Sequence, residues 1–248
     1  MTDASMLTTP QGRRIAYHLT DGAGPTVVFL GGFKSDMNGT KAIWLENWAK
    51  REGRAFLRFD YSGHGISSGD FTDGSIGDWC ADAQAALGLL DGPAVLVGSS
   101  MGGWISLLIA RAVPDRIAGL VTIAAAPDFT EDGMWASFDA DQRAAMQTNG
   151  QIALPSEYGA PYIITQRLIE DGRDRLVLRA PLALPFCVRF LQGTADADVS
   201  TDVALRLLDH AIGDDMRLTL VKGADHRFSD ERCLTLLGDT LAEVLASV

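Results

Sequence analysis

The sequence predicts an α/β fold: a mostly parallel, twisted sheet with helices on both faces and a small helical lid insertion. Short apolar runs alternate along the chain with helix-like segments, a pattern typical of parallel strands joined by crossover helices. One long segment, at about 128–182, breaks this rhythm. The 248 residues are 47% hydrophobic, enough for one sizeable core, so we expect a single domain over 1–248.

The elements follow one another in a regular order. A Pro-Gln-Gly turn between 5–9 and 14–19 predicts an N-terminal hairpin. The apolar runs that predict strands lie at 26–30, 55–59, 94–98, 117–125, 186–193 and 216–221. Helices are expected at 41–52, 75–90, 101–112 and 201–212, and from about 229 onward. Because crossovers between parallel strands are right-handed, the active site is expected at the carboxyl ends of the strands.

The segment at 128–182 contains helix-like stretches and several prolines but no obvious buried strand. An insertion of this length is more often a lid than a loop, because long structureless loops are rare in compact domains. Its large apolar side chains would form either a wall for a substrate group or the core of the lid itself. They are Met134, Trp135, Phe138, Met146, Tyr158 and Tyr162, of which Trp135, Tyr158 and Tyr162 are candidate substrate-binding residues.

Composition excludes several classes of function. The formal net charge of −11 disfavours binding to nucleic acid or to an anionic membrane surface. No apolar run is long enough to cross a bilayer, and no signal or transit pattern is visible, so a cytoplasmic location is expected. The three cysteines lie far apart without a CxxC motif, which predicts neither disulfides nor a metal site.

The pattern G-x-S-x-G, which marks a nucleophilic serine where a strand turns into a helix, occurs twice. In the copy at 98–102, the first glycine ends a predicted strand and the last opens a predicted helix, so Ser100 lies on the required sharp turn. The copy around Ser67 has no helix after it and is interpreted as a tight loop. Ser100 is the candidate nucleophile. An ordinary helix cap, or a register shifted to Ser99, remains the alternative.

A histidine base is expected in the loop after the last strand, and His226 occupies that place. His64 is the runner-up, since its turn also follows a predicted strand, but we expect it to line the pocket or cap a turn. Asp196 follows the strand at 186–193 and completes the chain order Ser…Asp…His. A carboxylate is needed there to hold the imidazole in one tautomer. Asp198 and Asp128 are the competing acids.

Stabilising an oxyanion requires two N–H donors. One is expected from the backbone of Met101, directly after the nucleophile, and the other from Phe33 in the loop that follows the first core strand. Gly32, beside Phe33, is expected to face the substrate. The pair Gly31 and Gly32 would equally suit a plain tight turn.

Four segments carry a resemblance to a known family: GGFKSDMNGTKA (31–42), RFDYSGHGISSG (58–69), DGPAVLVGSSMGGW (91–104) and GADHR (223–227). They resemble the α/β-hydrolase superfamily of serine hydrolases, and within it the mitochondrial palmitoyl-protein thioesterases, which also act as acyl-glucuronide esterases. The resemblance implies an α/β-hydrolase fold and hydrolysis of S-acyl or O-acyl bonds by Ser100, Asp196 and His226. Most α/β-hydrolases have His-Gly where this chain has Gly31 and Gly32.

The sequence therefore predicts a serine carboxylesterase or thioesterase that needs no metal or organic cofactor. The expected substrate is a small molecule or an acylated protein, and no nucleic acid or membrane span is expected. A C–C bond hydrolase or a small-ester esterase on the same fold is the first alternative. A non-catalytic protein that binds small molecules with this fold is the second.

Overall fold

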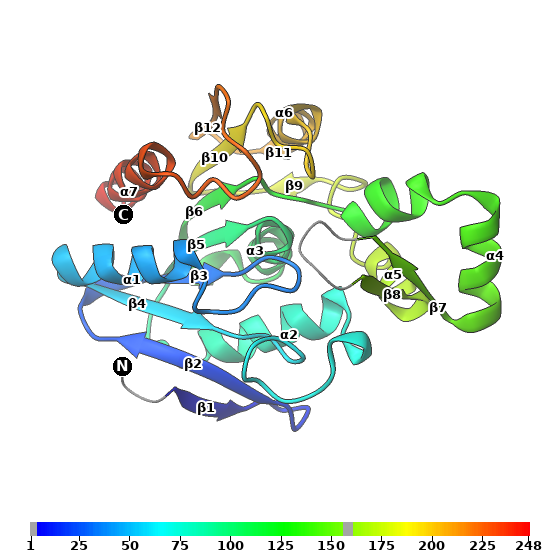
Figure 1. Cartoon of the computed structure of the whole chain (residues 1–248). Coiled ribbons are helices and arrows are strands. Elements are labelled where there is room, and N and C mark those ends of the chain that lie inside the picture. The colour runs from blue at the N-terminus through cyan, green and yellow to red at the C-terminus, as the bar shows by residue number, and fades with distance from the viewer. Residues whose placement is uncertain (1–3, 156–160) are drawn as a thin grey trace.

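The computed structural model describes residues 4–155 and 161–248. In this part of the chain, eight strands form one sheet in the order β1-β2-β4-β3-β5-β6-β10-β12 (Figure 1). Their bounds are β1 Ser5–Thr8, β2 Arg14–Thr20, β3 Ala23–Leu30, β4 Arg54–Phe59, β5 Ala94–Ser99, β6 Ile117–Ile123, β10 Cys187–Gly193 and β12 Met216–Val221. The predicted α/β class and the N-terminal hairpin are confirmed.

The order of the strands in the sheet determines where a binding site can form. Strands β1 and β2 pair antiparallel, β2 pairs antiparallel with β4, and the strands from β4 across to β12 run parallel. Strand β3 lies between β4 and β5, so the chain leaves β3 first to one side and later returns on the other. Such a reversal opens a crevice at the carboxyl ends of the two central strands. Here those ends belong to β3 and β5.

Helices cover both faces of the sheet because alternate strand residues point to opposite sides. On one face α2 (Ile76–Leu87), α3 (Met101–Ala112) and α6 (Thr201–His210) share a core with Val28 and Leu30. On the other, α1 (Thr40–Arg51) and α7 (Glu231–Ala246) share a core with Val27 and Phe29. Two short 3-10 helices, Phe71–Asp73 and Pro114–Arg116, join elements of this framework.

The insertion between β6 and β10 lies to one side of the sheet (Figure 1). It contains a π-helical turn (Thr130–Trp135), α4 (Ala140–Asn149), β7 (Gln151–Leu154), β8 (Tyr162–Thr165), α5 (Gln166–Arg173) and β9 (Leu182–Ala183), which pairs with β11 (Ala211–Ile212). The expected helical lid insertion also contains two short strands, since β7 and β8 form an antiparallel pair. Each strand has only four residues, of which one is buried, so neither has the apolar run of a buried strand.

The two ends of the insertion are joined by Asp128. Its side chain is fully buried, and its carboxylate accepts hydrogen bonds from the backbone N–H groups of Val177 (2.8 Å) and Leu178 (3.0 Å) and from the Arg179 guanidinium (3.2 Å). Burial raises the pKa of Asp128, although the two amides and Arg179 oppose the shift. These bonds fix where the insertion leaves the sheet and where it returns.

Candidate active site

Ser100 stands on the turn between β5 and α3, with φ 54° and ψ −118°. This backbone conformation is strained for a residue with a side chain, and it persists only where the surroundings enforce it. The Ser100 amide donates to the carbonyl of Ile123 (2.9 Å), and the Ser100 carbonyl accepts from the amides of Gly103 (2.9 Å) and Ala126 (3.1 Å). The turn is thereby tied to the neighbouring strand and to the start of α3.

Two glycines allow the chain to turn this sharply. A Cβ on Gly98 would lie 2.4 Å from the carbonyl oxygen of Gly102, and a Cβ on Gly102 would lie 2.0 Å from that of Leu30. Both distances are far inside van der Waals contact, so any side chain would push the strand and helix apart. The glycines of the G-x-S-x-G pattern are therefore required by close packing.

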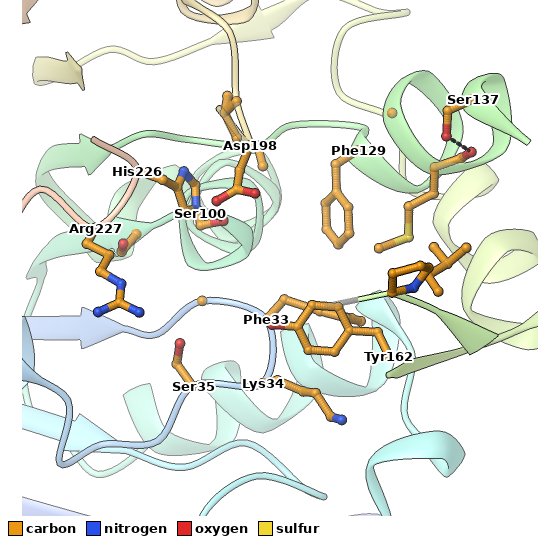
Figure 2. A pocket seen from close by; sticks show the side chains of 18 of the residues that line it. Phe33, Lys34, Ser35, Ser100, Phe129, Ser137, Tyr162, Asp198, His226 and Arg227 are labelled. Atoms are coloured by element: carbon orange, nitrogen blue, oxygen red, sulfur yellow. Dashed lines mark hydrogen bonds between the residues drawn. The ribbon is translucent and has the colours of Figure 1, made fainter. Parts of the chain in front are cut away.

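Ser100, His226 and Asp196 come together from three separate loops. The Nε2 atom of His226 lies 3.1 Å from the Ser100 hydroxyl, and its Nδ1 lies 2.9 and 3.0 Å from the two Asp196 carboxylate oxygens. His226 follows β12 and Asp196 follows β10, so both reach the carboxyl edge of the sheet where β5 ends. Figure 2 shows the imidazole of His226 directed at Ser100.

The Asp196 carboxylate is completely enclosed. Burial alone would raise its pKa, but the hydrogen bonds from His226, the Val199 amide and Gln192 outweigh burial and hold the pKa below its usual value. The amides of Asp198 and Val199 donate to one carboxylate oxygen at 2.9 and 2.8 Å. Asp196 thus stays ionised at neutral pH and faces the ring N–H of His226.

Gln192 is a site residue that the sequence did not single out. It is fully buried on β10, and its amide nitrogen donates to the Asp196 carboxylate (2.9 Å) and to the carbonyl of Val199 (2.9 Å). It therefore joins the strand to the loop that carries Asp196. A glutamine inside the strand run FCVRFLQG gives no signal for this role, because its partners lie in the next loop.

The loop after β3 passes directly beside Ser100. A Cβ on Gly32 would lie 3.4 Å from the Ser100 Cβ, and the Ser35 amide donates to the Gly32 carbonyl (3.1 Å), closing a turn with Phe33 and Lys34 at its centre. Met101 is the first residue of α3, so its amide has no acceptor within the helix. The loop that carries Phe33 and the first turn of α3 thus both adjoin Ser100.

A cavity of about 710 Å³ opens over Ser100 and His226, within the usual range for small-molecule sites. Figure 2 shows the rings of Phe33, Phe129 and Tyr162 on one side of Ser100 and the guanidinium of Arg227 on the other. Met134 and Leu154 of the lid also line the cavity, as do two polar residues on the side of the rings, Lys34 and Ser137. Ser35, Lys41 and Asp198 are further polar lining residues. The lid side of the cavity is thus mainly apolar, with Lys34 and Ser137 as its polar residues, and the side toward the loop after β12 is polar.

Lys41 is a cation in this polar wall. It lies near the start of α1, and its ammonium donates to the backbone carbonyl of Arg227. Burial lowers the pKa of Lys41 to about 8. The contact ties α1 to the loop that carries His226.

The substrate-binding residues expected from the sequence have different outcomes. Gly32 and Tyr162 line the cavity, as does Met134. Trp135 is not among the lining residues in the described part of the chain; the guanidinium groups of Arg143 and Arg173 lie over its ring, 5.1 and 4.6 Å from the ring centre. Tyr158 lies outside the described residues. Phe138 and Met146 are buried in the core of the lid.

The alternative residues occupy other places. The Ser67 hydroxyl donates to the Asp60 carbonyl (2.7 Å) and accepts from the Ala16 amide (2.8 Å), which holds its loop against β2. Asp128 joins the ends of the insertion, as described above. Asp198 lines the cavity, but the carboxylate bonded to the imidazole is that of Asp196.

Among the described residues, one group has donor atoms close enough to hold a metal ion. It consists of Asp196, Asp198 and His226, whose donor atoms lie within 4.8 Å of one another. Two of the three already bond to each other through the atoms that a metal would need. The arrangement therefore suits a hydrogen-bonded triad better than a metal centre.

Comparison with known proteins agrees with this geometry. The model of the alpha/beta hydrolase family matches residues 27–244. The chain belongs to the alpha/beta hydrolase family. The predicted superfamily is thus confirmed, and the chain is classed as a hydrolase.

Relatives of this hydrolase extend over its whole length. The rat mitochondrial palmitoyl-protein thioesterase ABHD10 is 33% identical over 247 residues, which is 98% of this chain and 83% of the relative. A solved protein from Agrobacterium vitis S4 is 39% identical, with a TM-score of 0.94 over 98% of both chains. Mouse alpha/beta hydrolase domain-containing protein 10 is 31% identical, with a TM-score of 0.91 over 99% of both.

No helix within 4–155 and 161–248 combines the length and the apolar character needed to cross a bilayer.

Proposed function

We propose that this hydrolase cleaves carboxylic esters or thioesters through an acyl-enzyme on Ser100. One observation carries the proposal: the 3.1 Å contact between the Ser100 hydroxyl and His226 Nε2, while Nδ1 of the same ring faces the buried carboxylate of Asp196. Because that carboxylate can only accept, Nδ1 carries the proton. Nε2 is then free to take the proton of the serine.

The reaction has two steps. His226 removes the Ser100 proton as the oxygen attacks the acyl carbonyl, and the new imidazolium then protonates the departing alcohol or thiol. In the second step His226 activates a water that attacks the acyl-enzyme, and Ser100 leaves with the proton restored. Asp196 stabilises the imidazolium in both steps. The amides of Phe33 and Met101 would hold the oxyanion, each contributing about 10²–10³-fold to the rate.

The lid side of the cavity favours an apolar acyl group. Phe33, Phe129, Met134, Leu154 and Tyr162 line it, and only Lys34 and Ser137 add polar side chains there, whereas Lys41 and Arg227 lie on the other side of Ser100. The mitochondrial relatives are palmitoyl-protein thioesterases by name, which supports an S-acyl or O-acyl substrate carried by a small molecule or a protein. We expect the acyl group to lie against the lid and the leaving group to face Arg227.

A labelling experiment tests the nucleophile. A fluorophosphonate probe, followed by peptide mapping, should label Ser100, and Ser100→Ala should keep its melting temperature while losing labelling and turnover. Ser67→Ala, from the second G-x-S-x-G copy, is the matched control and should still be labelled. Labelling at any other serine, or wild-type turnover by folded Ser100→Ala, would refute the assignment.

Acyl preference needs a separate measurement. A series of p-nitrophenyl esters and matched thioesters, from two to sixteen carbons, should show kcat/KM rising with apolar acyl size. Phe129→Ala should reduce that gain by about tenfold, because a buried ring face is lost. A flat series in the wild type would contradict the placement of the acyl group on the lid side.

The domain organisation and the cellular location of the protein are still predictions. We propose that residues 1–248 form a single domain, which should unfold in one cooperative transition followed by fluorescence and circular dichroism alike. The cytoplasm remains the expected location, whereas the names of the relatives specify mitochondria. Fractionation of cells that produce the protein would decide the location.

A further inference from the structure

His64 is a buried histidine that the proposed reaction does not use. Only 3% of its surface is exposed, and the rings of Tyr61, Phe71 and Trp79 surround it with centroids at 5.1–5.5 Å. A histidine enclosed in this way must have both ring nitrogens hydrogen-bonded, because an unpaired buried polar atom is costly.

The partners of His64 determine its protonation. Its Nδ1 lies 3.1 Å from the carbonyl oxygen of Ser62, which can only accept, so Nδ1 carries a proton. The backbone N–H of Lys34 donates to Nε2 at 3.2 Å, so Nε2 carries none. The ring is therefore neutral and in one tautomer. Burial lowers the pKa of His64, which keeps it neutral.

Lys34 belongs to the turn that passes beside Ser100. The turn is closed by the bond from the Ser35 amide to the Gly32 carbonyl, and Lys34 has φ 57°, whereas Phe33 does not have a positive φ. A positive φ at the third residue is the mark of a type II turn, where glycine or asparagine is usual. Lysine is strained there, so another contact must hold the central peptide in this orientation.

The central peptide of a β-turn can flip, and type I and type II turns differ mainly by that flip. A flipped peptide would turn the Phe33 carbonyl toward Nε2 of His64, where two lone pairs would meet. In the observed orientation the Lys34 N–H fills that place instead. The hydrogen bond to His64 thus favours the type II turn, with its strained Lys34, over the type I turn.

Further polar contacts hold the loop that carries His64 in place. The Ser62 amide and hydroxyl donate to the buried carboxylate of Asp82 at 2.9 and 2.6 Å, and Asp82 pairs with Arg13 at 2.7 Å. The Ser62 carbonyl accepts from Trp79 Nε1 (3.1 Å) as well as from His64. A chain of polar contacts therefore runs from α2 to the loop after β3.

We propose that His64 is a positioning residue: by accepting the Lys34 amide it fixes the Phe33–Lys34 peptide and, because Phe33 belongs to both peptides, restrains the adjoining Gly32–Phe33 peptide, whose N–H is the proposed oxyanion donor. The inference rests on the proposed function, since the Phe33 amide matters to catalysis only if an oxyanion forms on the acyl group attacked by Ser100. The side chain of Phe33 is anchored separately by edge contacts with the rings of Phe71 (4.8 Å) and Trp79 (5.9 Å).

Two amide variants separate the two bonds of His64. In His64→Gln the side-chain oxygen reaches the place of Nε2 and can still accept from Lys34. In His64→Asn the shorter side chain can keep the bond to the Ser62 carbonyl but cannot reach Lys34. Packing is disturbed in both, so a merely structural role would lower the two activities in parallel with the two melting temperatures.

The experiment measures kcat and KM on a p-nitrophenyl ester, together with the inhibition constant of a trifluoromethyl ketone, which forms a tetrahedral adduct. Melting curves confirm that each variant is folded at the assay temperature. For His64→Asn we expect kcat to fall by about 10–100-fold and the ketone to bind correspondingly more weakly, with KM within threefold, because a misplaced donor weakens only the transition state. His64→Gln should stay within about threefold of wild type in kcat.

Equal kcat for folded His64→Asn and wild type would overturn the proposal, as would equal losses in both variants. Failure of both to fold would also overturn it, because His64 would then be a core residue only. A wrong functional proposal would give a different result, because the wild type itself would then show no labelling of Ser100 and no turnover.

Discussion

Asp196→Asn tests the assigned acid most directly. The amides of Asp198 and Val199 donate to one carboxylate oxygen, at 2.9 and 2.8 Å, so the asparagine oxygen is drawn to that side. The new NH₂ group then takes the place of the other oxygen, which lies 2.9 Å from His226 Nδ1. This NH₂ group opposes a proton on Nδ1, and the remaining oxygen, 3.0 Å from Nδ1, already accepts the two backbone amides, so the tautomer with the proton on Nε2 is favoured.

The magnitude follows from that change of tautomer. With its proton on Nε2, His226 donates to the Ser100 hydroxyl and cannot accept its proton, and the charge that stabilised the imidazolium is also gone. We expect kcat to fall by about 10⁴-fold, or about 5.5 kcal/mol in the barrier. The opposite orientation of the asparagine amide is disfavoured, because it would place the NH₂ group against the backbone amides of Asp198 and Val199.

The assay is ester hydrolysis at saturating substrate, with thermal unfolding to confirm that the fold survives. Asp198→Asn is the matched control: its backbone amide still donates to Asp196, so kcat should change by less than about tenfold. A kcat for Asp196→Asn within tenfold of wild type, or a greater loss in Asp198→Asn, would refute the assignment.

Three further predictions concern stability. Asp128→Ala leaves the buried amides of Val177 and Leu178 without an acceptor, so the free energy of unfolding should fall by about 2–4 kcal/mol in urea denaturation; an unchanged midpoint would show that water replaces the carboxylate. Because the folded-state pKa of Lys41, about 8, is below its unfolded value of 10.5, the wild type should gain stability as pH rises from 8 to 10.5. Lys41→Met should remove that gain and stabilise the protein at pH 7 by on the order of 1–3 kcal/mol; a parallel pH dependence in the two proteins would contradict the burial. The pKa of Asp196 is lower in the folded state, so its stabilisation is complete above the unfolded value of 3.8 and is lost as pH falls through the folded value. Asp196→Asn should therefore show a shallower loss of melting temperature below pH 4, and an equal slope would contradict the ionised state.

Fold class followed from the sequence because its signals are local. Runs such as TVVFL and AVLVG are apolar on both faces, which only a strand covered by helices on both sides can bury. The serine turn was equally readable, since a strand, a tight turn and a helix are adjacent in sequence. The chain order of Ser100, Asp196 and His226 then placed all three at the carboxyl edge of one sheet.

The tertiary structure alone decided the contacts that join distant segments. The acceptor for the Lys34 amide lies 30 residues away on His64, and Asp128 finds its amide donors about 50 residues later. Within 4–155 and 161–248, β7 and β8 pair only with each other, and neither carries the long apolar run by which buried strands are recognised.

Local patterns determine which elements form and in what order, because backbone hydrogen bonding and the period of apolar residues depend on near neighbours. The direction of a buried polar side chain depends instead on what packs against it from elsewhere in the chain. For that reason the roles of Gln192, His64 and Asp128 emerge only once the chain is folded.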